Sequence, residues 1–562
     1  MAVKQLIECV PNFSEGKDMS IIKQITDEIE KIEGVKLLDV DPGKATNRTV
    51  VTFVGEPEPV IEAAFMAIKK ASEIIDMSKH KGEHPRMGAT DVCPLIPIAN
   101  ISMEETAAYA VALAKRAGSE LDIPFYLYEA AATKPNRKNL ATVRAGEYEG
   151  LPQKLADPKW KPDYGPAKFN PRAGSTAIGA RDFLIAYNIN LNTTSVRRAN
   201  SIAFDIRENG RLKREGGKVS GKIIKDKKGN PLRTKGKCKA VKAIGWYIEE
   251  YGVAQISMNL TNIKLTSLHK AFEETCKSAD KRGIRVTGSE IVGLVPLKVM
   301  LDAGNYFLKK QERSTGISEK EIIHIAVKSL GLDELAPFDP EKKIIEYVLK
   351  SDEVRPLVKQ TLRQFANETA SESPAPGGGS IAAYVGALGI SLGTMVANLS
   401  SHKRGWDSKW ETYSDVADEG QELKEELLFL VDEDTAAFNQ IITAFRMPKN
   451  TEVEKSDRKD AIQAATKNAI DIPFRVMTTS SKCFALLKNM AKTGNPNSVS
   501  DAGVGALCAK TAVHGAYLNV LINCKDLEDQ KYIDKTLAKA KTVLNKAIAS
   551  EKEILKIVTS KM

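Results

Sequence analysis

The segment GVKLLDVDPGKATNRTVVTFVGEPEPVIEAAFMAIKKASEIID, residues 34–76, decides the fold class of the N-terminal region. Residues 34–41 and 48–55 are two short apolar runs, the second rich in β-branched residues, and they predict two strands. Residues 58–76 place apolar side chains at helical spacing, which predicts an amphipathic helix. The flanking runs predict a strand, a helix and a closing strand: 4–11, 18–32 and 92–100. The resulting order, β-α-β-β-α-β, is that of a ferredoxin-like split unit.

A similar order returns further along the chain. The predicted strands and helices follow one another as strand 183–191, helix 194–209, two strands within 242–263, helix 267–283 and strand 284–296. We therefore expect two α+β subdomains of similar topology, with connecting helices. A cleft between two such subdomains is a natural site for a small molecule.

Beyond about residue 340 the strand-like alternation ends and long helical segments follow. The expected fold is therefore multidomain: an N-terminal α+β part with two ferredoxin-like βαββαβ subdomains, followed by an all-α helical bundle. The predicted divisions are two subdomains, a helical linker and the bundle: 1–180, 181–325, 326–350 and 351–562. Residues 380–401 are apolar enough to span a bilayer, but polar residues interrupt them, and we expect a central bundle helix rather than a membrane span.

Composition is that of a globular protein, with 42% hydrophobic and 27% charged residues. Much of the net charge of +10 lies in the lysine-rich segment 210–242, which is either a polyanion-binding patch or a solvated basic hairpin. No aromatic residue interleaves its charges, so we favour the hairpin and expect no nucleic-acid partner. The seven cysteines are scattered without a CxxC pair, and the N-terminus shows no secretory signal, which together predict a cytoplasmic protein.

Two histidines, His80 and His84, lie in the segment KHKGEHPRMGATDVCPLIP, residues 79–97. Their spacing suits a zinc-binding helix, but Gly82 and Pro85 argue against a helix here and no third ligand follows at zinc spacing. We therefore expect no metal. Charged neighbours can tune an imidazole for general-base work near neutral pH, although an ordinary loop histidine is the alternative.

In the C-terminal region, SESPAPGGGSIAA (371–383) sets three glycines before an apolar helix, where free backbone amides attract anions. The segment LVDEDTAAFNQI (430–441) holds Asp432, Glu433 and Asp434. A buried carboxylate among them could shuttle a proton, whereas an exposed acidic helix face is the alternative. The loop at 160–180 is either a plain connection or a binding loop.

Eight motifs occur in an order that resembles the formiminotransferase-cyclodeaminase family over essentially the whole chain. They are IECVPNFSEGKD, LLDVDPGKATNRTVVTFVG, HKGEHPRMGATDVCP, RAGEYEGLP, GWYIEEYGVAQISMNL, GLVPLKVMLDA, APGGGSIAA and GAYLNVLIN. The lysine-rich segment 210–242 looks longer than in that family. The resemblance implies a bifunctional folate enzyme of histidine degradation. Such an enzyme moves the formimino group of N-formimino-L-glutamate to tetrahydrofolate, then closes the product to 5,10-methenyltetrahydrofolate with loss of ammonia.

The resemblance also implies roles for particular residues. His84 matches the catalytic histidine of the transferase and Asp434 the acid/base carboxylate of the cyclodeaminase, and Asp41 would orient His84 or steady the cationic formimino group. The residues implied to bind folate form two groups, one in each half: Gly165, Pro166, Ala167, Lys168, Phe169, Asn170, Pro171, Arg172, Ala173 and Gly174; and Gly377, Gly378, Gly379 and Ser380.

Tetrahydrofolate, expected in its polyglutamylated form, is implied as co-substrate, without a metal or a membrane partner, in a cytoplasmic homo-oligomer. Positive surface would then retain the polyglutamylated intermediate. Two alternatives stay open: a formiminotransferase that uses another donor such as formiminoglycine, and a folate-binding protein that retains only one activity.

Overall fold

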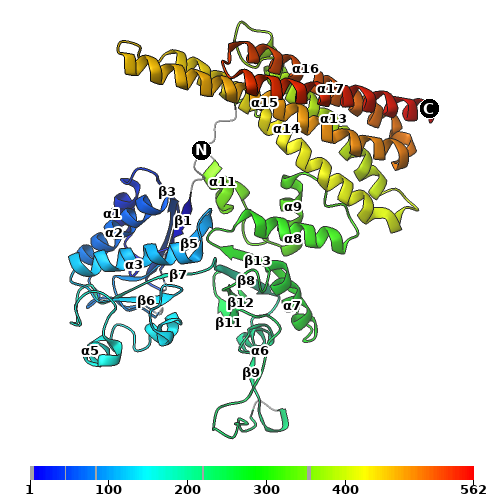
Figure 1. Cartoon of the computed structure of the whole chain (residues 1–562). Coiled ribbons are helices and arrows are strands. Elements are labelled where there is room, and N and C mark those ends of the chain that lie inside the picture. The colour runs from blue at the N-terminus through cyan, green and yellow to red at the C-terminus, as the bar shows by residue number, and fades with distance from the viewer. Residues whose placement is uncertain (1–4, 45, 83–84, 218–219, 351–355) are drawn as a thin grey trace. The chain divides into compact units, whose positions relative to one another are not determined.

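The computed structural model describes residues 5–44, 46–82, 85–217, 220–350 and 356–562. The chain forms two compact units (Figure 1). An α/β unit comprises the residues up to 300 together with 330–351, and a helical unit comprises 301–329 with the residues from 352 onward. The domain boundaries expected at residues 180, 325 and 350 remain predictions.

The first sheet of the α/β unit is built on four antiparallel strands in the order β3-β4-β1-β5. Their bounds are β1 Leu6–Cys9, β3 Val35–Gly43, β4 Arg48–Gly55 and β5 Thr90–Ala99. The short β2 (Asn12–Phe13) also pairs with β4 and β5. Beyond β5 the sheet continues through two parallel strands, β7 (Thr176–Ala180) and β6 (Phe125–Glu129), which the sequence patterns did not predict.

Helices cover one face of this sheet: α1 Met19–Glu30, α2 Pro57–Ile74 and α3 Met103–Glu120. Side chains that alternate along each strand supply the sheet's part of that core, among them Ile7, Cys9, Phe53 and Leu95. The opposite face meets the loops that carry the candidate site. These loops include two short helices, α4 (Leu140–Val143) and α5 (Leu151–Ala156).

The second sheet has four antiparallel strands in the order β11-β12-β8-β13. Their bounds are β8 Ile185–Leu191, β11 Val241–Ile248, β12 Val253–Leu260 and β13 Val286–Val292, and the helices between them are α6 Val196–Ile206 and α7 Leu268–Asp280. In the chain these elements follow the predicted order β-α-β-β-α-β. Residues 330–351 add α10 (Pro340–Lys343) and α11 (Ile345–Lys350) to this unit.

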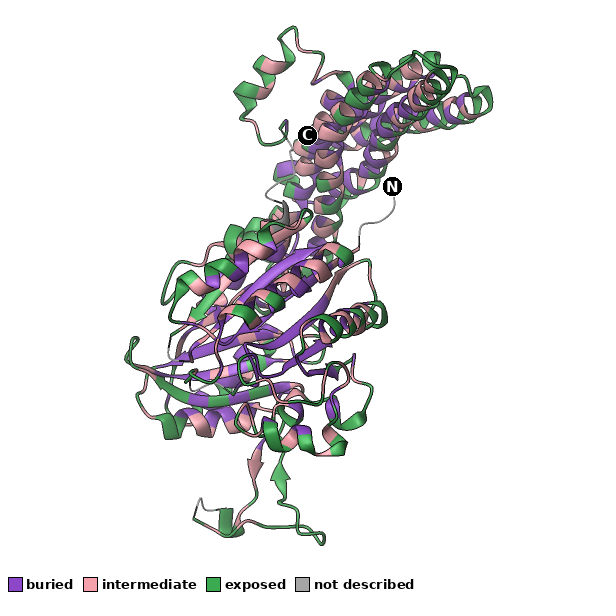
Figure 2. Ribbon diagram, turned by 90° about the vertical axis from the view of Figure 1, so that its left-hand side faces the viewer, coloured by how far each residue is buried: buried purple, intermediate pink, exposed green. Residues whose placement is uncertain are grey.

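The lysine-rich segment forms the predicted hairpin. Two short strands, β9 (Arg211–Leu212) and β10 (Arg233–Thr234), pair at its base, and the carboxylate of Asp226 accepts hydrogen bonds from two backbone amides at its turn. The hairpin projects from the second lobe of this unit and is mostly exposed (Figures 1 and 2). Of its described residues between 213 and 232, none belongs to a hydrophobic core.

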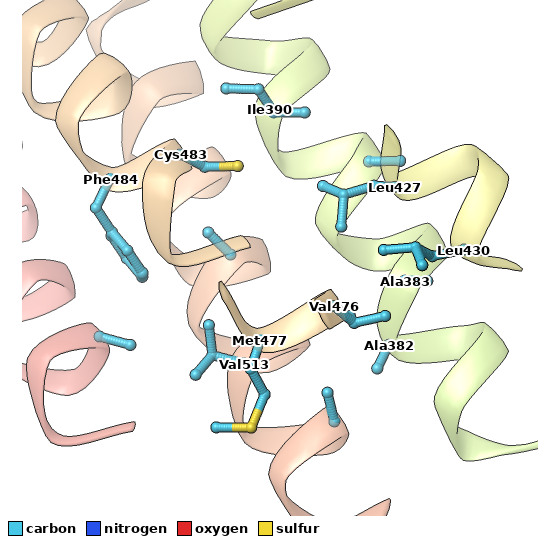
Figure 3. Close-up of a cluster of buried hydrophobic side chains, with 14 of the residues drawn as sticks. Ala382, Ala383, Ile390, Leu427, Leu430, Val476, Met477, Cys483, Phe484 and Val513 are labelled. Atoms are coloured by element: carbon cyan, nitrogen blue, oxygen red, sulfur yellow. The ribbon is translucent and has the colours of Figure 1, made fainter. Parts of the chain in front are cut away.

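The helical unit is an all-α bundle in its described part, as predicted. Its helices are α9 Glu319–Leu330, α12 Leu362–Thr369, α13 Gly378–Ser401, α14 Trp410–Phe445, α15 Glu452–Thr493, α16 Val499–Asn523 and α17 Gln530–Thr559, and α8 (Leu297–Lys310) lies across the boundary between the units. Ile390 of α13, Leu427 and Leu430 of α14, Met477 of α15 and Val513 of α16 meet in its core (Figure 3).

Helix α13 is long and apolar enough to cross a membrane, and 61% of its most apolar window is buried inside the unit. Small residues along it permit close packing against α15 and α16. Gly386 lies against Ala512 and Ser480, and Gly393 against Leu486 and Leu487. This is the environment of the central bundle helix that the sequence predicts.

Candidate functional sites

In the α/β unit, the turn between β3 and β4 anchors the segment that begins at His80. Asn47 adopts a left-handed conformation with φ of 47°, and its side chain accepts from the Gly16 N–H at 3.0 Å and donates to the Lys81 carbonyl at 3.0 Å. The imidazole Nε2 of His80 lies 2.8 Å from the Asn47 carbonyl oxygen. Because a carbonyl can only accept, Nε2 carries the proton and Nδ1 is left as an acceptor.

Arg86, six residues after His80, holds the segment from its other side. Its Nε–H donates to His80 Nδ1 at 3.3 Å, and its terminal nitrogens form a bidentate pair with Glu149 at 2.6 and 2.9 Å. Glu147 adds a contact at 3.2 Å. The hydrogen bonds that Arg86 donates to Glu149 raise the pKa of Arg86 and lower the pKa of Glu149. Bidentate geometry fixes direction as well as distance, so this end of the segment is tightly placed.

A polar cavity of about 520 Å³ opens beside these groups, lined by Lys81, Gly82, Arg86, Gly146, Glu147 and Glu149. His84 lies outside the described residues, so its position relative to this cavity is not described. Asp41 is exposed near the end of β3, where its backbone pairs with Val50.

The predicted folate-binding segment, residues 165–174, bonds to the chain on both sides of residues 80–86, which we call the histidine segment. The Met77 N–H donates to the Arg172 carbonyl at 2.9 Å, and the Ala89 N–H donates to the Ala173 carbonyl at 2.8 Å. Gly174 has a φ of +70°, and a Cβ there would lie 2.2 Å from the Met87 carbonyl oxygen, so the close approach requires glycine.

Asn170 organises the turn within this segment. Its Oδ1 accepts from the N–H groups of Arg172 and Ala173 at 3.1 and 3.0 Å. Tyr148 connects Arg86 to the segment 165–174: its N–H donates to the Arg86 carbonyl at 2.8 Å, and its hydroxyl donates to the Pro171 carbonyl at 2.6 Å. The Tyr148 ring also contacts Phe169, with centroids 5.5 Å apart.

The other predicted residues of the segment are more open. Gly165, with a φ of +77°, turns the chain directly over the Ile123 carbonyl, and Pro166 follows it half-buried. Ala167 and Lys168 are exposed.

Beneath the loop, Asp91 is fully buried and forms an ion pair with Arg144 at 2.6 Å while accepting from the Met87 N–H at 3.0 Å. Burial raises the pKa of Asp91, against the opposing charges of Arg144 and Arg48. Breaking a buried pair of this kind leaves an uncompensated charge, so it fixes the base of the loop.

In the helical unit, the second candidate site joins α14 to the start of α13. The Ser380 N–H donates to Asp434 Oδ2 at 2.8 Å, and the Ser380 hydroxyl lies 3.2 Å from the same oxygen and 2.8 Å from the Val431 carbonyl. Burial raises the pKa of Asp434, and the two hydrogen bonds from Ser380 oppose that shift. A carboxyl with a raised pKa is suited to take and return a proton.

The glycines before Ser380 leave room around this carboxyl. A Cβ at Gly379 would lie 2.1 Å from Asp434 Oδ1, and one at Gly378 would lie 3.2 Å from the amide of Asn519 on α16. Gly377 caps the helix without a side-chain hydrogen bond. Asp432, two residues from Asp434, instead accepts from the N–H groups of Leu357 and Val358, so neighbouring carboxylates serve different partners.

Sequence patterns missed several of these residues. Arg86 pairs with residues about sixty positions away, and His80 with one 33 positions away, so no local spacing marks them. Asn519 lies inside the motif GAYLNVLIN, but nothing in the motif places it beside Gly378. Among the described residues, no group of three or more His, Cys, Asp or Glu side chains is arranged to hold a metal.

Three family descriptions match consecutive parts of the chain. Residues 6–181 match "Formiminotransferase domain, N-terminal subdomain", residues 186–350 match "Formiminotransferase domain", and residues 361–542 match "Formiminotransferase-cyclodeaminase".

Curated relatives agree with these matches. The formimidoyltransferase-cyclodeaminase of Mus musculus is 44% identical over 97% of both chains. A glutamate formimidoyltransferase of Streptococcus pyogenes is 42% identical over 55% of this chain and 95% of its own. A methenyltetrahydrofolate cyclohydrolase of Methylorubrum extorquens is 34% identical over 36% of this chain and 98% of its own.

Proposed function

The chain belongs to the formiminotransferase-cyclodeaminase family, and we propose that it carries both activities of that family. It would transfer the formimino group of N-formimino-L-glutamate to tetrahydrofolate, and then cyclise 5-formiminotetrahydrofolate to 5,10-methenyltetrahydrofolate. The similarity to the mouse protein over 97% of both chains is the observation that supports this most, because it spans the α/β and the helical unit together.

For the transfer, we assign the proton relay to His84. Nitrogen 5 of the folate attacks the formimino carbon and must lose its proton, which the neutral imidazole takes. The bond to the glutamate nitrogen then breaks, and the same imidazole returns the proton to that nitrogen as glutamate leaves. Asp41 would orient His84 or face the cationic formimino group, and residues 165–174 would hold the folate. The hydrogen bonds that tie this segment to both flanks of the histidine segment support the assignment.

For the cyclisation, we assign both proton transfers to Asp434. Nitrogen 10 attacks the formimino carbon and loses a proton, and the amine gains a proton before it leaves as ammonia. One carboxyl lying between the two nitrogens can carry out both steps. Its burial and its raised pKa support this role, and Gly377, Gly378, Gly379 and Ser380 would form the adjoining wall of the folate pocket.

Further features of the family fit what is described. We propose that both sheets of the α/β unit are ferredoxin-like, which the antiparallel orders β3-β4-β1-β5 and β11-β12-β8-β13 support. The folate would be polyglutamylated and the protein a cytoplasmic homo-oligomer. Exposed apolar side chains on the bundle surface, Leu388, Met395 and Leu399 of α13 and Leu507 and Leu518 of α16, support contacts between copies.

The test is an assay of purified protein with formiminoglutamate and tetrahydrofolate that follows methenyltetrahydrofolate by absorbance and ammonia by a coupled reaction. Both products should form together. Activity only with formiminoglycine would instead support the other-donor alternative, and folate binding without either product would support a folate-binding protein that retains at most one activity.

Single substitutions should separate the two steps. His84→Ala should lower the transfer rate by a factor of 100 or more, roughly the value of a general base, and leave cyclisation of supplied 5-formiminotetrahydrofolate unchanged. Asp434→Asn should do the reverse. If either folded variant lost both activities equally, the assignment of one step to each unit would be wrong.

A further inference from the structure

Glu8 occupies an unusual place for a charged residue. It lies in β1, between two strands, and its backbone partners are Val54 of β4 and Ile96 of β5. Only 2% of its surface is exposed. Charged side chains are rarely buried to this extent unless they are paired.

The Glu8 carboxyl has no such pair. Within the described part of the chain it forms no hydrogen bond and no ion pair, and the opposite charge that acts on it is that of Arg181. Burial therefore raises its pKa from 4.5 to about 7, with Arg181 opposing the shift. Burying an unpaired carboxyl costs free energy of folding, which an apolar side chain at this position would avoid. The stability of the fold therefore gives no reason for a carboxyl here.

The direction of the side chain indicates its use. Its neighbours Ile7 and Cys9 pack in the core beneath the helices, so Glu8 faces the opposite side of the sheet. Asp39, opposite Thr52, and Asp41, opposite Val50, lie on that same side. Burial raises the pKa of Asp39, and the nearby charge of Lys343 opposes the shift.

We propose that Glu8 is a substrate-binding residue of the transferase site, where its carboxylate accepts two hydrogen bonds from a planar pair of N–H groups. The inference rests on the proposed function. Two substrates of that reaction carry such a pair: the amidinium of the formimino donor, and the aminopyrimidinone edge of tetrahydrofolate. Either would supply the donors that the buried carboxylate lacks in the free protein.

In the complex, the N–H donors of the ligand favour the ionised carboxylate of Glu8. In the free protein near pH 7, the carboxyl is a mixture of its protonated and ionised forms. A ligand that binds only the carboxylate must compete with its protonation, so affinity should fall as the pH drops below about 7. The charge of Arg181 acts directly on Glu8. Lys36, which like Glu8 pairs with Val54, lies on the same face of the sheet as Asp39 and Asp41, and the charge of Lys343 acts on Asp39.

The experiment compares wild-type protein with Glu8→Gln, which keeps the shape and removes the charge. Equilibrium binding of formiminoglutamate and of tetrahydrofolate is measured separately by calorimetry at pH 6, 7 and 8, alongside KM and kcat for transfer. We expect one of the two affinities to fall roughly 10- to 100-fold, and its pH dependence to disappear in the variant. The ligand affected identifies which N–H pair Glu8 holds.

Two controls make the result interpretable. Glu104→Gln removes an exposed carboxylate of α3 in the same unit and should change neither affinity. Cyclisation of supplied 5-formiminotetrahydrofolate should be unaffected in both variants. If Glu8→Gln binds both ligands like the wild type at all three pH values, the proposal is overturned. Because binding is measured directly, a wild-type protein without turnover would count against the proposed function and leave the Glu8 comparison valid.

Discussion

At the scale of single residues, Gly379 shows how closely the bundle approaches its candidate acid/base group. An added Cβ would lie 2.1 Å from Asp434 Oδ1 and 2.5 Å from its Cγ, far inside van der Waals contact. Gly379→Ala should therefore push the carboxyl away from the Ser380 N–H and lower the cyclisation rate by roughly 100-fold, the order expected when a proton-transfer group is lost. Steady-state kinetics with supplied 5-formiminotetrahydrofolate measure this.

The control for Gly379→Ala is Lys539→Ala, on an exposed position of α17 in the same unit. It should retain cyclisation, and both variants should retain transfer in the α/β unit. A Gly379→Ala protein that cyclises at the wild-type rate would mean that Asp434 does not need this position for the chemistry.

At the scale of elements, the basic hairpin can be tested apart from the sheet that carries it. Leu212 and Arg233 lie directly opposite each other in the β9–β10 pair, so a two-residue Asn-Gly turn can replace residues 213–232 and keep β9 paired with β10. The melting temperature should hardly change, because the described residues removed contribute nothing to a core. If the hairpin retains a polyglutamylated intermediate, the shortened variant should release more of that intermediate into solution at low salt than the wild type does. The release should also depend less on salt in the variant. Rapid-quench measurement of free 5-formiminotetrahydrofolate decides this.

What the sequence could predict about these elements depended on how local the signal was. Alternation and helical spacing located β3, β4 and α2 to within a few residues, because each pattern lies inside one element. The strand β7, TAIGA, was missed because its small residues carry little strand preference. The His80–Asn47 and Arg86–Glu149 contacts depend on tertiary folding across 33 and 63 positions, and no spacing rule reaches that far.

At the scale of the whole molecule, residues 301–329 belong with the helical unit although they precede the expected boundary of the bundle at residue 351. The Thr315 N–H donates to Ser414 Oγ at 2.9 Å, and the side chains of Asn398 and Gln421 donate to the Gly316 carbonyl at 2.8 and 3.0 Å. These groups are largely withdrawn from solvent, and cutting the chain at 351 would leave their partners in α13 and α14 unpaired.

A fragment of residues 297–562 should therefore be more stable than one of residues 351–562. These three hydrogen bonds alone, at about 1 kcal/mol each, predict a melting temperature roughly 6–12 °C lower for the shorter fragment. The Thr315 hydroxyl makes two further contacts that are also lost, with Ser414 Oγ at 3.0 Å and Asp418 Oδ2 at 2.8 Å. Calorimetry of the two fragments measures the difference, and cyclisation at low temperature shows whether each is folded. In the full chain, Gly316→Ala should also lower the melting temperature of the helical unit, because a Cβ there would lie 2.2 Å from the Cβ of Ala417. Equal melting temperatures for the two fragments would instead mean that residues 301–329 add nothing to the bundle, and that the expected boundary at 351 is the one at which the helical unit folds.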